Sequence, residues 1–413
     1  MSSQPSVSFV PARAEHRNIA LDQLAAMLRD QCARAVDVYA GAGAIRSVGS
    51  RLVLHDTSPH LGPDGVTMTA GTYRINDIAI AQIAEKLSIP LPYLRRLASD
   101  HVDLCDANIN GWLERTDRRF LVRTLRTPSP TLTGPTSPTG LYGGSGVPAL
   151  GGSGSGLDGV VRAFLSDRYL RLDNLDVLLA ALEGVHSSGA NVTIEGCDLS
   201  DRRMYVRMYA PGVQALAPTL LANYRSPFDS RPGSQLPVVW GGFVIRNSET
   251  GSGAFAIYPR LMVQVCRNGM VLEHASNIRR THLGAKFTGG DGIITASAQT
   301  LDKSLELITS ITRDAVRAYL DPDFVQRMVR DLEHTAGTPV TDPDTTIKVV
   351  SQKLKFTEAQ QNAILAHFIR GGDLSAGGVM HAVTSVAQTL TDPDSAYDME
   401  TDAMKALQLA AST

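Results

Sequence analysis

Cysteine is scarce in this sequence. Four thiols, Cys32, Cys105, Cys197 and Cys266, are spread over 413 residues, and no CxxC pair is present. This spacing argues against a structural zinc site and against a disulfide framework. No run of 18 apolar residues exists, which excludes a transmembrane helix, and residues 1–20 lack the apolar core of a signal peptide. We therefore expect a cytoplasmic protein that does not contact a membrane.

Aromatic residues are also few, at 6%, whereas 43% hydrophobic and 19% charged residues are ordinary for a globular protein. The length suggests two or three domains. The sequence lacks Walker A, HExxH and GxSxG motifs, and no GxGxxG follows a strand. We therefore predict no metal and no cofactor. Enzyme activity stays uncertain, with a non-enzymatic role favoured.

Charge is unevenly distributed, although the net charge of the whole chain is only -2. Residues 1–201 carry 18 basic and 21 acidic side chains, residues 202–286 carry 11 and 3, and residues 287–413 carry 10 and 17. The corresponding net charges are -3, +8 and -7. A basic middle attracts a polyanion such as nucleic acid. It also fits an acidic C-terminal part that simply packs near it.

The N-terminal region, residues 1–126, mixes helix and strand patterns. Within it, residues 77–97 show two stretches of helical apolar spacing around a break that contains proline. This is the outline of a helix-turn-helix, whose second helix would enter a major groove with Arg95 and Arg96 exposed. The alternative is a helical hairpin docked on a sheet, with solvated arginines.

Residues 127–157 form a low-complexity tract in which 24 of 31 residues are Gly, Pro, Ser or Thr and none is charged. Such a composition does not bury enough apolar area to become ordered. Strand patterns at 120–125 and 160–165 flank the tract. We therefore predict a disordered loop that joins two strands of one sheet, rather than a linker between domains.

Residues 158–286 are predicted to form a basic, mainly antiparallel β core. Arg203–Tyr209 alternates between methionine or valine on one face and arginine or tyrosine on the other, which is the period of a strand. Asn268-Gly269 is a strong hairpin signal. The arginine and tyrosine face fits single-stranded nucleic acid, or it belongs to an ordinary amphipathic strand whose side chains cover the sheet.

The candidate nucleic-acid-binding residues lie on this β core and in the cationic segment that follows it. The basic side chains would contact phosphates, and the two tyrosines would stack on bases. The set comprises Arg203, Tyr205, Arg207, Tyr209, Arg260, Arg267, Arg279, Arg280 and Lys286.

Residues 287–413 are predicted to form an acidic helical domain. Apolar residues recur every seven positions from Ile294 to Ala315, which predicts a long helix with a seam for another helix or subunit. Thr357 and Gln360 predict a capping box. Three Asp-Pro-Asp sequences each precede a helix pattern, so we favour helix capping over metal binding for them. They are residues 321–323, 342–344 and 392–394.

One group of acidic residues offers an alternative of metal-dependent chemistry. Asp167, Asp173 and Asp176 follow a predicted strand and could bind Mg²⁺ in a nuclease. The simpler interpretation is that Asp173 or Asn174 caps the next helix and that Asp167 pairs with an arginine. Cys266 at a strand end is either a reactive thiol or, more simply, a buried structural cysteine.

Several segments together resemble a known family. They are VRAFLSDRYLRLDNLD (Val161–Asp176), GGFVIRNSETGSGAFAIYPRLMVQVCRNGMV (Gly241–Val271), IAQIAEKLSIPLPYLRRL, NGWLERTDRRFLVRTL and HAVTSVAQTLTDPDSAYDMETDAMKAL. As a set, over most of residues 75–410, they resemble the phage and plasmid family called domain of unknown function 932. The resemblance implies a protein of a phage, prophage or plasmid. It implies no established activity and no catalytic residues, and the tract at 127–157 is not part of the pattern.

These observations predict an α+β fold with a mainly antiparallel sheet and a helical C-terminal domain. The function that we expect is nucleic-acid binding in phage DNA metabolism, specifically an oligomeric protein that anneals single-stranded DNA without metal or nucleotide. The layout of a basic sheet and an acidic helical tail is analogous to such recombinases. A self-associating scaffold or host-defence antagonist, with a protein partner for the acidic C-terminal domain, is the alternative, and a metal-dependent nuclease is the second.

Overall fold

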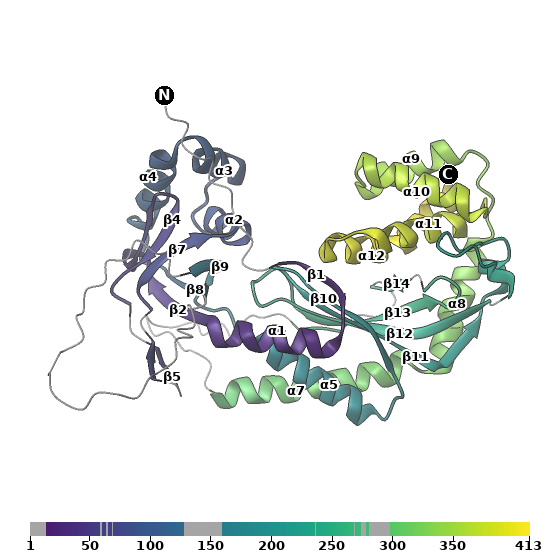
Figure 1. The fold of residues 1–413 in the computed structure, drawn as a ribbon, viewed down its shortest axis with the longest axis horizontal. Coiled ribbons are helices and arrows are strands. Elements are labelled where there is room, and N and C mark those ends of the chain that lie inside the picture. Colours follow the sequence, from purple (N-terminus) through teal and green to yellow (C-terminus); the bar gives the residue numbers. More distant parts are fainter. Residues whose placement is uncertain are drawn as a thin grey trace, which may run out of the picture. The chain divides into compact units, whose positions relative to one another are not determined.

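The computed structural model of the chain describes residues 14–57, 60–62, 65–67, 69–127, 159–235, 237–267, 269–273, 278–280 and 298–413. It confirms the α+β fold with a helical C-terminal part (Figure 1). The chain divides into two compact units. Unit 1 includes Asp30–Asp167, and unit 2 includes Arg13–Arg29 and Arg168–Thr413.

Unit 1 is built on a six-stranded sheet in the order β2-β8-β9-β7-β4-β3. Its strands are β2 (Ala35–Gly41), β3 (Ile45–Val48), β4 (Arg51–Leu54), β7 (Gly71–Ile75), β8 (Arg119–Arg126) and β9 (Gly159–Ser166). The short helix η1 (Ala42–Ala44) follows β2, and β5 (His60–Gly62) pairs with β6 (Gly65–Thr67). All the pairs in the large sheet are antiparallel except β7 with β9.

The strands on either side of the low-complexity tract, β8 and β9, pair with each other as the sequence predicts. The tract itself, after Thr127, lies outside the described residues. The division between the units therefore falls after β9, at Asp167, rather than at the predicted boundary of 158. The reason is that β9 completes the sheet of unit 1.

Three helices cover one face of this sheet: α2 (Asp77–Lys86), α3 (Leu91–Asp100) and α4 (Val102–Leu113). They bury apolar side chains such as Ile83, Leu94 and Ile109 against the inward residues of the strands. The helices predicted for residues 77–97 are therefore confirmed. Arg95 forms an ion pair with Asp77 at 2.6 Å, whereas the Arg96 side chain is 77% exposed.

Unit 2 is built on a seven-stranded antiparallel sheet in the order β1-β10-β11-β12-β13-β14, with β15 also paired to β13. The strands are β1 (His16–Ile19), β10 (Thr193–Leu199), β11 (Met204–Leu216), β12 (Val238–Asn247), β13 (Phe255–Val263), β14 (Gly269–Val271) and β15 (Ile278–Arg280). Helix α1 (Leu21–Arg34) crosses the boundary between the units, and its residues Leu24 and Leu28 pack in the core of unit 2.

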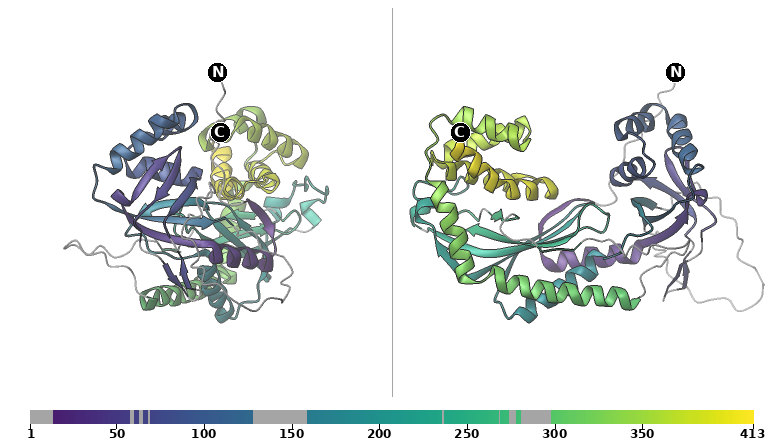
Figure 2. Two further views of the ribbon diagram at one scale, coloured as in Figure 1. Left: turned by 60° about the vertical axis from the view of Figure 1, so that its left-hand side comes forward. Right: turned by 180° about the vertical axis from the view of Figure 1, so that it is seen from behind.

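Helices cover both faces of the sheet of unit 2. On one face lie α5 (Asn174–Ser188) and α7 (Ala298–Tyr319), which bury Met204, Val206 and Met208 of β11. On the other lies α12 (Pro393–Ser412), as Figures 1 and 2 show. A sheet covered on both faces leaves neither face of its central strands open to a ligand.

The predicted seam of the long helix α7 is occupied by α5 of the same unit. The two helices approach closely at Gly184, where a Cβ atom would lie 2.5 Å from the carbonyl oxygen of Thr309. Ile308 and Ala315 are fully buried there. Ile294, at the start of the predicted repeat, lies outside the described residues.

The remaining helices of unit 2 form a second core with one end of the sheet. They are α6 (Pro218–Leu221), α8 (Pro322–Ala336), α9 (Pro343–Leu354), α10 (Glu358–Gly371) and α11 (Ala376–Thr389), and the short helix η2 (Gly233–Gln235) lies against Leu221 of α6. Asp321, Asp342 and Asp392 accept hydrogen bonds from backbone amides at the starts of α8, α9 and α12, and Thr357 and Gln360 form the predicted capping box. The capping interpretation of the three Asp-Pro-Asp sequences is confirmed.

No helix in the described ranges is both long enough and apolar enough to cross a lipid bilayer.

Candidate nucleic-acid interface

The predicted nucleic-acid-binding face of β11 is covered by helix α12. The alternation is confirmed, since the methionines and Val206 enter one core and Tyr205 enters another. The Tyr205 ring, however, is fully buried and stacks on Tyr397 of α12, with 4.6 Å between ring centroids. Because another aromatic ring already occupies this position, the prediction that Tyr205 stacks on a base is wrong for the structure described here.

Arg207 lies beneath the same helix in a buried ion pair. Its guanidinium donates to both carboxylate oxygens of Asp198, at 2.5 and 2.8 Å, and to the side-chain oxygen of Asn18 at 2.7 Å. Burial lowers the pKa of Arg207, but the carboxylates of Asp198 and Glu400 outweigh that effect and leave the pKa raised. The residue is 2% exposed. The prediction that Arg207 contacts phosphate is therefore wrong for this structure.

Arg260 repeats this arrangement on β13. Its guanidinium pairs with Glu195 of β10 and with Glu400 of α12, and the residue is also 2% exposed. Burial lowers its pKa, whereas Glu195 and Glu400 raise it more, so that the net pKa is raised. The prediction that Arg260 contacts phosphate is therefore wrong for this structure, because its guanidinium is buried and already paired with carboxylates.

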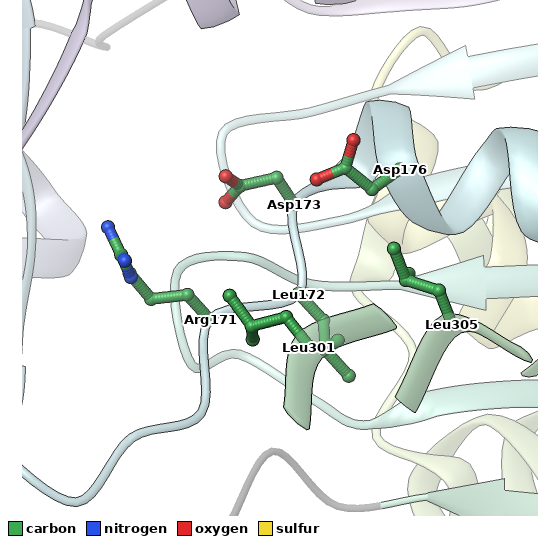
Figure 3. Close-up of a pocket in the computed structure, with 6 residues that line it drawn as sticks. All are labelled: Arg171, Leu172, Asp173, Asp176, Leu301 and Leu305. Atoms are coloured by element: carbon green, nitrogen blue, oxygen red, sulfur yellow. The ribbon is translucent and has the colours of Figure 1, made fainter. Parts of the chain in front are cut away.

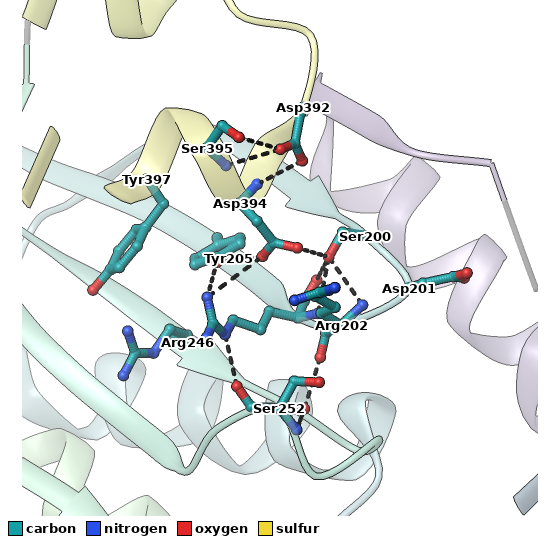
Figure 4. A network of polar contacts seen from close by, with 12 residues as sticks. Ser200, Asp201, Arg202, Tyr205, Arg246, Ser252, Asp392, Asp394, Ser395 and Tyr397 are labelled. Atoms are coloured by element: carbon teal, nitrogen blue, oxygen red, sulfur yellow. Dashed lines mark hydrogen bonds and ion pairs between the residues drawn. The ribbon is translucent and has the colours of Figure 1, made fainter. Parts of the chain in front are cut away.

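Arg203 is the most accessible of the three paired arginines, with 24% of its side chain exposed. Its guanidinium donates to the carbonyl oxygen of Ser252 at 2.9 Å and lies 3.8 Å from Asp394. Asp394 also accepts hydrogen bonds from the hydroxyls of Tyr205 at 2.6 Å and Ser200 at 2.8 Å (Figure 4). This network joins the start of α12 to the sheet and uses Arg203 as part of that junction.

We call these residues the ionic layer: Arg203, Arg207, Arg260, Asp198, Glu195, Asp394 and Glu400. It lies between the sheet of unit 2 and α12. Arg17 of β1 extends it, because its guanidinium donates to the carbonyl oxygens of Gln388 and Leu390 at the end of α11. The layer is a structural junction in which each arginine already has an acidic or carbonyl partner.

The other predicted residues lie in different surroundings. Tyr209 is half-buried and stacks on Trp240 with 5.0 Å between centroids. Arg267 is exposed and has a left-handed backbone, with φ at 57°. Arg279 and Arg280 lie in β15, paired with Ala256 and Phe255 of β13. Lys286 lies outside the described residues.

Contacts with the backbone bring three further arginines from other segments close to the turn that holds Arg267. The guanidinium of Arg231 donates to the carbonyl oxygen of Val265 at 2.9 Å, which brings the 225–231 segment to the turn that holds Arg267. The amide of Arg225 donates to the carbonyl oxygen of Gly371 at 3.0 Å, which brings the same segment to the end of α10, beside Arg370. All four arginines are exposed. We call Arg225, Arg231, Arg267 and Arg370 the arginine surface.

Charge on the arginine surface is mostly uncompensated. Arg231 pairs with Asp229 at 2.5 Å, whereas Arg225, Arg267 and Arg370 have no carboxylate within ion-pair distance in the described part of the chain. The Arg225 guanidinium contacts only a carbonyl oxygen, that of Ser230 at 3.1 Å, among the described residues. Exposed guanidinium groups without carboxylates remain available to an external anion.

An aromatic side chain accompanies these arginines. Phe228 is 50% exposed, and its ring centroid lies 6.1 Å from that of His367 on α10. Burial, followed by the charge of Arg370, lowers the pKa of His367. Ile369, on the same turn of α10, is 65% exposed. The arginine surface therefore combines positive charge with an exposed ring, two features that are common in proteins that bind single-stranded nucleic acid.

Two of the three acidic residues proposed for metal chemistry lie together in the structure. Asp173 and Asp176 line a small pocket with Arg171, Leu301 and Leu305, as Figure 3 shows, but Asp167 does not line it. Burial and the neighbouring acids Asp173 and Glu249 raise the pKa of Asp176. In the described ranges, no group of three or more His, Cys, Asp or Glu residues is arranged to hold a metal ion.

The polar groups beside this pocket serve to fix the chain. The backbone amide of Asn174 donates to the carboxylate of Glu249 at 3.1 Å, and the side chain of Asn247 donates to that of Asn174 at 2.9 Å. Asp173 is the residue before α5 but makes no side-chain cap bond. Cys266 is 9% exposed at a turn after β13, which matches the structural interpretation of that thiol.

Sequence reasoning missed Arg225, Phe228, Arg231 and Arg370. Arg225 and Phe228 lie in the sequence RSPFDSRPGS (225–234), where proline, glycine and serine predict an irregular loop with exposed side chains. An aromatic residue between two arginines of such a loop was a usable signal. Arg370 sits at the end of a helix 139 positions beyond Arg231, and a single sequence gives no sign of their proximity.

Comparisons with protein-family models, with curated proteins and with solved structures found no match to this chain. The resemblance to domain of unknown function 932 stays a prediction.

Proposed function

We propose that this protein binds nucleic acid through the arginine surface of unit 2, and that a single strand is its preferred ligand. The observation that carries the proposal is the exposure of Arg225, Arg267 and Arg370 without carboxylate partners in the described ranges. The proposal keeps the nucleic-acid function expected from the sequence and transfers it from the β11 face to this surface.

Electrostatics favours this surface over the ionic layer. A phosphate that approached Arg207 or Arg260 would have to replace a buried carboxylate, whereas at Arg225, Arg267 and Arg370 it would replace water and counterions. Binding through such exposed groups falls steeply with salt concentration.

Phe228 supplies the preference for a single strand. In a duplex the bases are stacked on one another, whereas an unpaired base offers its face to an aromatic ring. Stacking on one ring contributes about 1–3 kcal/mol and tolerates any base. The finer proposal is annealing of complementary strands by an oligomer in phage DNA metabolism, without metal or nucleotide, because base pairing itself drives that reaction.

The test compares two variants that lose the same charge. Arg225→Gln/Arg267→Gln/Arg370→Gln removes the three arginines of the arginine surface that lack a carboxylate partner in the described ranges, and Arg327→Gln/Arg330→Gln/Lys348→Gln removes three exposed cations from α8 and α9. Fluorescence anisotropy with a labelled oligothymidylate is measured at several salt concentrations. The first variant should bind at least tenfold more weakly, and its slope of log affinity against log salt should fall by about 2, at about 0.7 per phosphate contact.

The control variant should keep the affinity of the wild type within about threefold. Equal losses in the two variants would mean that only net charge matters, and the arginine surface would be rejected. An absence of salt-sensitive binding by the wild-type protein would reject the nucleic-acid function itself. Phe228→Ala should weaken binding to the oligonucleotide more than binding to a duplex of the same length.

A further inference from the structure

The face of the unit 1 sheet opposite its three helices carries a pair of arginines at one register position. Arg51 of β4 lies directly opposite Arg74 of β7 in the antiparallel ladder, and both side chains are exposed. Residues directly opposite each other in such a ladder have Cβ atoms about 4.5–5.5 Å apart. Like charges at that separation destabilise the pair of strands.

Among the residues that the structure describes, neither arginine has a partner that offsets this repulsion. In the described ranges, no carboxylate lies within ion-pair distance of Arg51 or Arg74, and neither guanidinium donates a hydrogen bond to a described residue. Arg46 of β3 lies on the same face, diagonally across from Arg51, because it pairs with Val53. It lies 3.7 Å from Glu114, with both side chains more than half exposed, which is a weak interaction in water.

The apolar core on the opposite face of the sheet fixes the strand register that places Arg51 opposite Arg74. Leu52 and Tyr73, the neighbours of Arg51 and Arg74 along their strands, are fully buried among the helices of unit 1. A slip of one residue between the strands would bring an arginine into that core, so the register cannot relax to separate the charges. On the same face as the two arginines, Val48, Val53, Thr72 and Val160 are uncharged, whereas Arg162 of β9, diagonal to Arg74, is a buried arginine.

From this arrangement we propose that Arg51 and Arg74, with Arg46 beside them, form a binding site for a phosphoryl group on unit 1. Two adjacent guanidinium groups provide the planar, multiple donors that an oxyanion of phosphate accepts, and the bound anion would offset their mutual repulsion. The strands fix the donors before the ligand arrives, which reduces the entropy lost on binding. The site is separate from the arginine surface of unit 2 and goes beyond the proposed function.

Two sources of phosphate share this chemistry: the backbone of a nucleic acid, and a free phosphate or pyrophosphate. The experiment measures hydrogen exchange of the full-length protein with inorganic pyrophosphate or with a short oligothymidylate as the probe. Segments 45–54 and 71–75, which contain β3, β4 and β7, report on the site. Their exchange should slow when a ligand binds, because binding opposes local opening of the strands.

The variants again form a matched pair. Arg51→Gln/Arg74→Gln removes the site, and Arg96→Gln/Arg115→Gln removes two exposed charges elsewhere in unit 1. We expect the ligand to protect segments 45–54 and 71–75 in the wild type and in the Arg96/Arg115 variant, and to do so at least tenfold more weakly in the Arg51/Arg74 variant. Protection by pyrophosphate would assign the site to free phosphates, and protection by the oligonucleotide alone would assign it to a nucleic-acid backbone.

Absence of protection in the wild type with both probes would overturn the proposal, and so would undiminished protection in the Arg51/Arg74 variant. The double variant removes a repulsion, so it should be at least as stable as the wild type. If it nevertheless unfolds, Arg74→Gln alone provides the same comparison. The Arg225/Arg267/Arg370 variant should retain pyrophosphate protection in unit 1, which separates failure of this site from failure of the proposed function.

Discussion

Arg207 and Arg267 come from the same basic segment of the sequence, yet they have opposite surroundings in unit 2. Arg207 is 2% exposed and donates to both oxygens of Asp198 beneath α12. Arg267 is exposed on a turn after β13 and has no carboxylate partner within the described ranges. The first arginine holds the molecule together, and the second is available to an external anion.

The difference shows why the net charge of a segment is a poor guide to what its charges do. The carboxylates that neutralise the arginines of β11 and β13 come from Glu195, Asp198, Asp394 and Glu400, all of which lie outside the segment 202–286. The net charge of +8 for that segment therefore adds together two kinds of charge, those that are buried and paired and those that are exposed and unpaired. Only the exposed charges contribute to attraction of a polyanion.

The largest effect on stability should come from removing Arg207 from its buried ion pair with Asp198. Arg207→Met leaves the Asp198 carboxylate, which is completely inaccessible to solvent, without its main partner. Breaking a buried ion pair in this way costs about 3–5 kcal/mol in the free energy of unfolding. Urea unfolding followed by Trp240 fluorescence, in a Trp112→Phe background that leaves one tryptophan in unit 2, measures the change.

Arg225→Met is the matched control, because it removes an exposed arginine of the same unit. It should change the free energy of unfolding by less than about 0.5 kcal/mol. If Arg207→Met cost as little as Arg225→Met, the contrast between the ionic layer and the arginine surface would be wrong.

A buried histidine tests the contrast between buried and exposed groups through the pH dependence of the free energy of unfolding. His381 on α11 is 1% exposed, lies against Tyr224 and makes a hydrogen bond with the carbonyl oxygen of Leu220. Burial lowers its pKa to about 4, below the value of about 6.5 in the unfolded chain. Between these values the unfolded chain binds more protons, so stability falls as the pH falls from about 6.5 to about 4 and is fully retained above that window.

The loss from His381 across that window is on the order of 3 kcal/mol. Urea unfolding at pH 7.5, 5.5 and 4.5 measures it, and His381→Gln, which cannot be protonated, should remove that part of the pH dependence. An unchanged pH profile in the variant would show that other groups cause the loss at low pH.

A moderate effect is expected at an exposed cap. The Asp321 side chain accepts a hydrogen bond from the amide of Phe324 at 2.9 Å at the start of α8. Asp321→Ala should reduce the free energy of unfolding by about 1 kcal/mol, because one helix amide loses its partner and a favourable charge leaves the helix N-terminus. Asp321→Asn retains the acceptor and should recover most of the stability, measured by the same urea titration.

The smallest effect on stability should occur at Arg267. Arg267→Gln should leave the free energy of unfolding within about 0.5 kcal/mol of the wild type, while weakening binding to single-stranded DNA severalfold and lowering its salt slope by about 0.7. A combination of unchanged stability and unchanged affinity would remove Arg267 from the arginine surface. Denaturation and anisotropy on the same preparation give both values.

Much of the fold could be predicted because it depends on local patterns. The strict alternation of Arg203–Tyr209 placed that segment in a strand, the Asp-Pro-Asp sequences marked three helix starts, and the strands flanking residues 127–157 were expected to pair. These features follow from residue spacing, backbone geometry and side-chain capping within a few positions.

The candidate site could not be predicted to the same extent. Period-two alternation gives two faces but does not reveal which of them a helix will cover, and α12, which covers the face with Tyr205, begins 188 positions later at Pro393. The arginine surface likewise joins Arg225, Arg267 and Arg370 from three segments. The boundary between the units was predicted at residue 158, before β9. It lies after β9 because β9 pairs with the preceding strand β8 in the sheet of unit 1.

The sequence by itself determined the α+β class, the local elements and the excess of arginine in the middle of the chain. The tertiary structure decided which of those arginines are available. Burial and pairing depend on contacts between residues far apart in the chain, such as Arg260 with Glu400. A buried guanidinium stays charged beside a carboxylate that offsets its lost hydration, whereas an exposed one keeps its water until an anion replaces it.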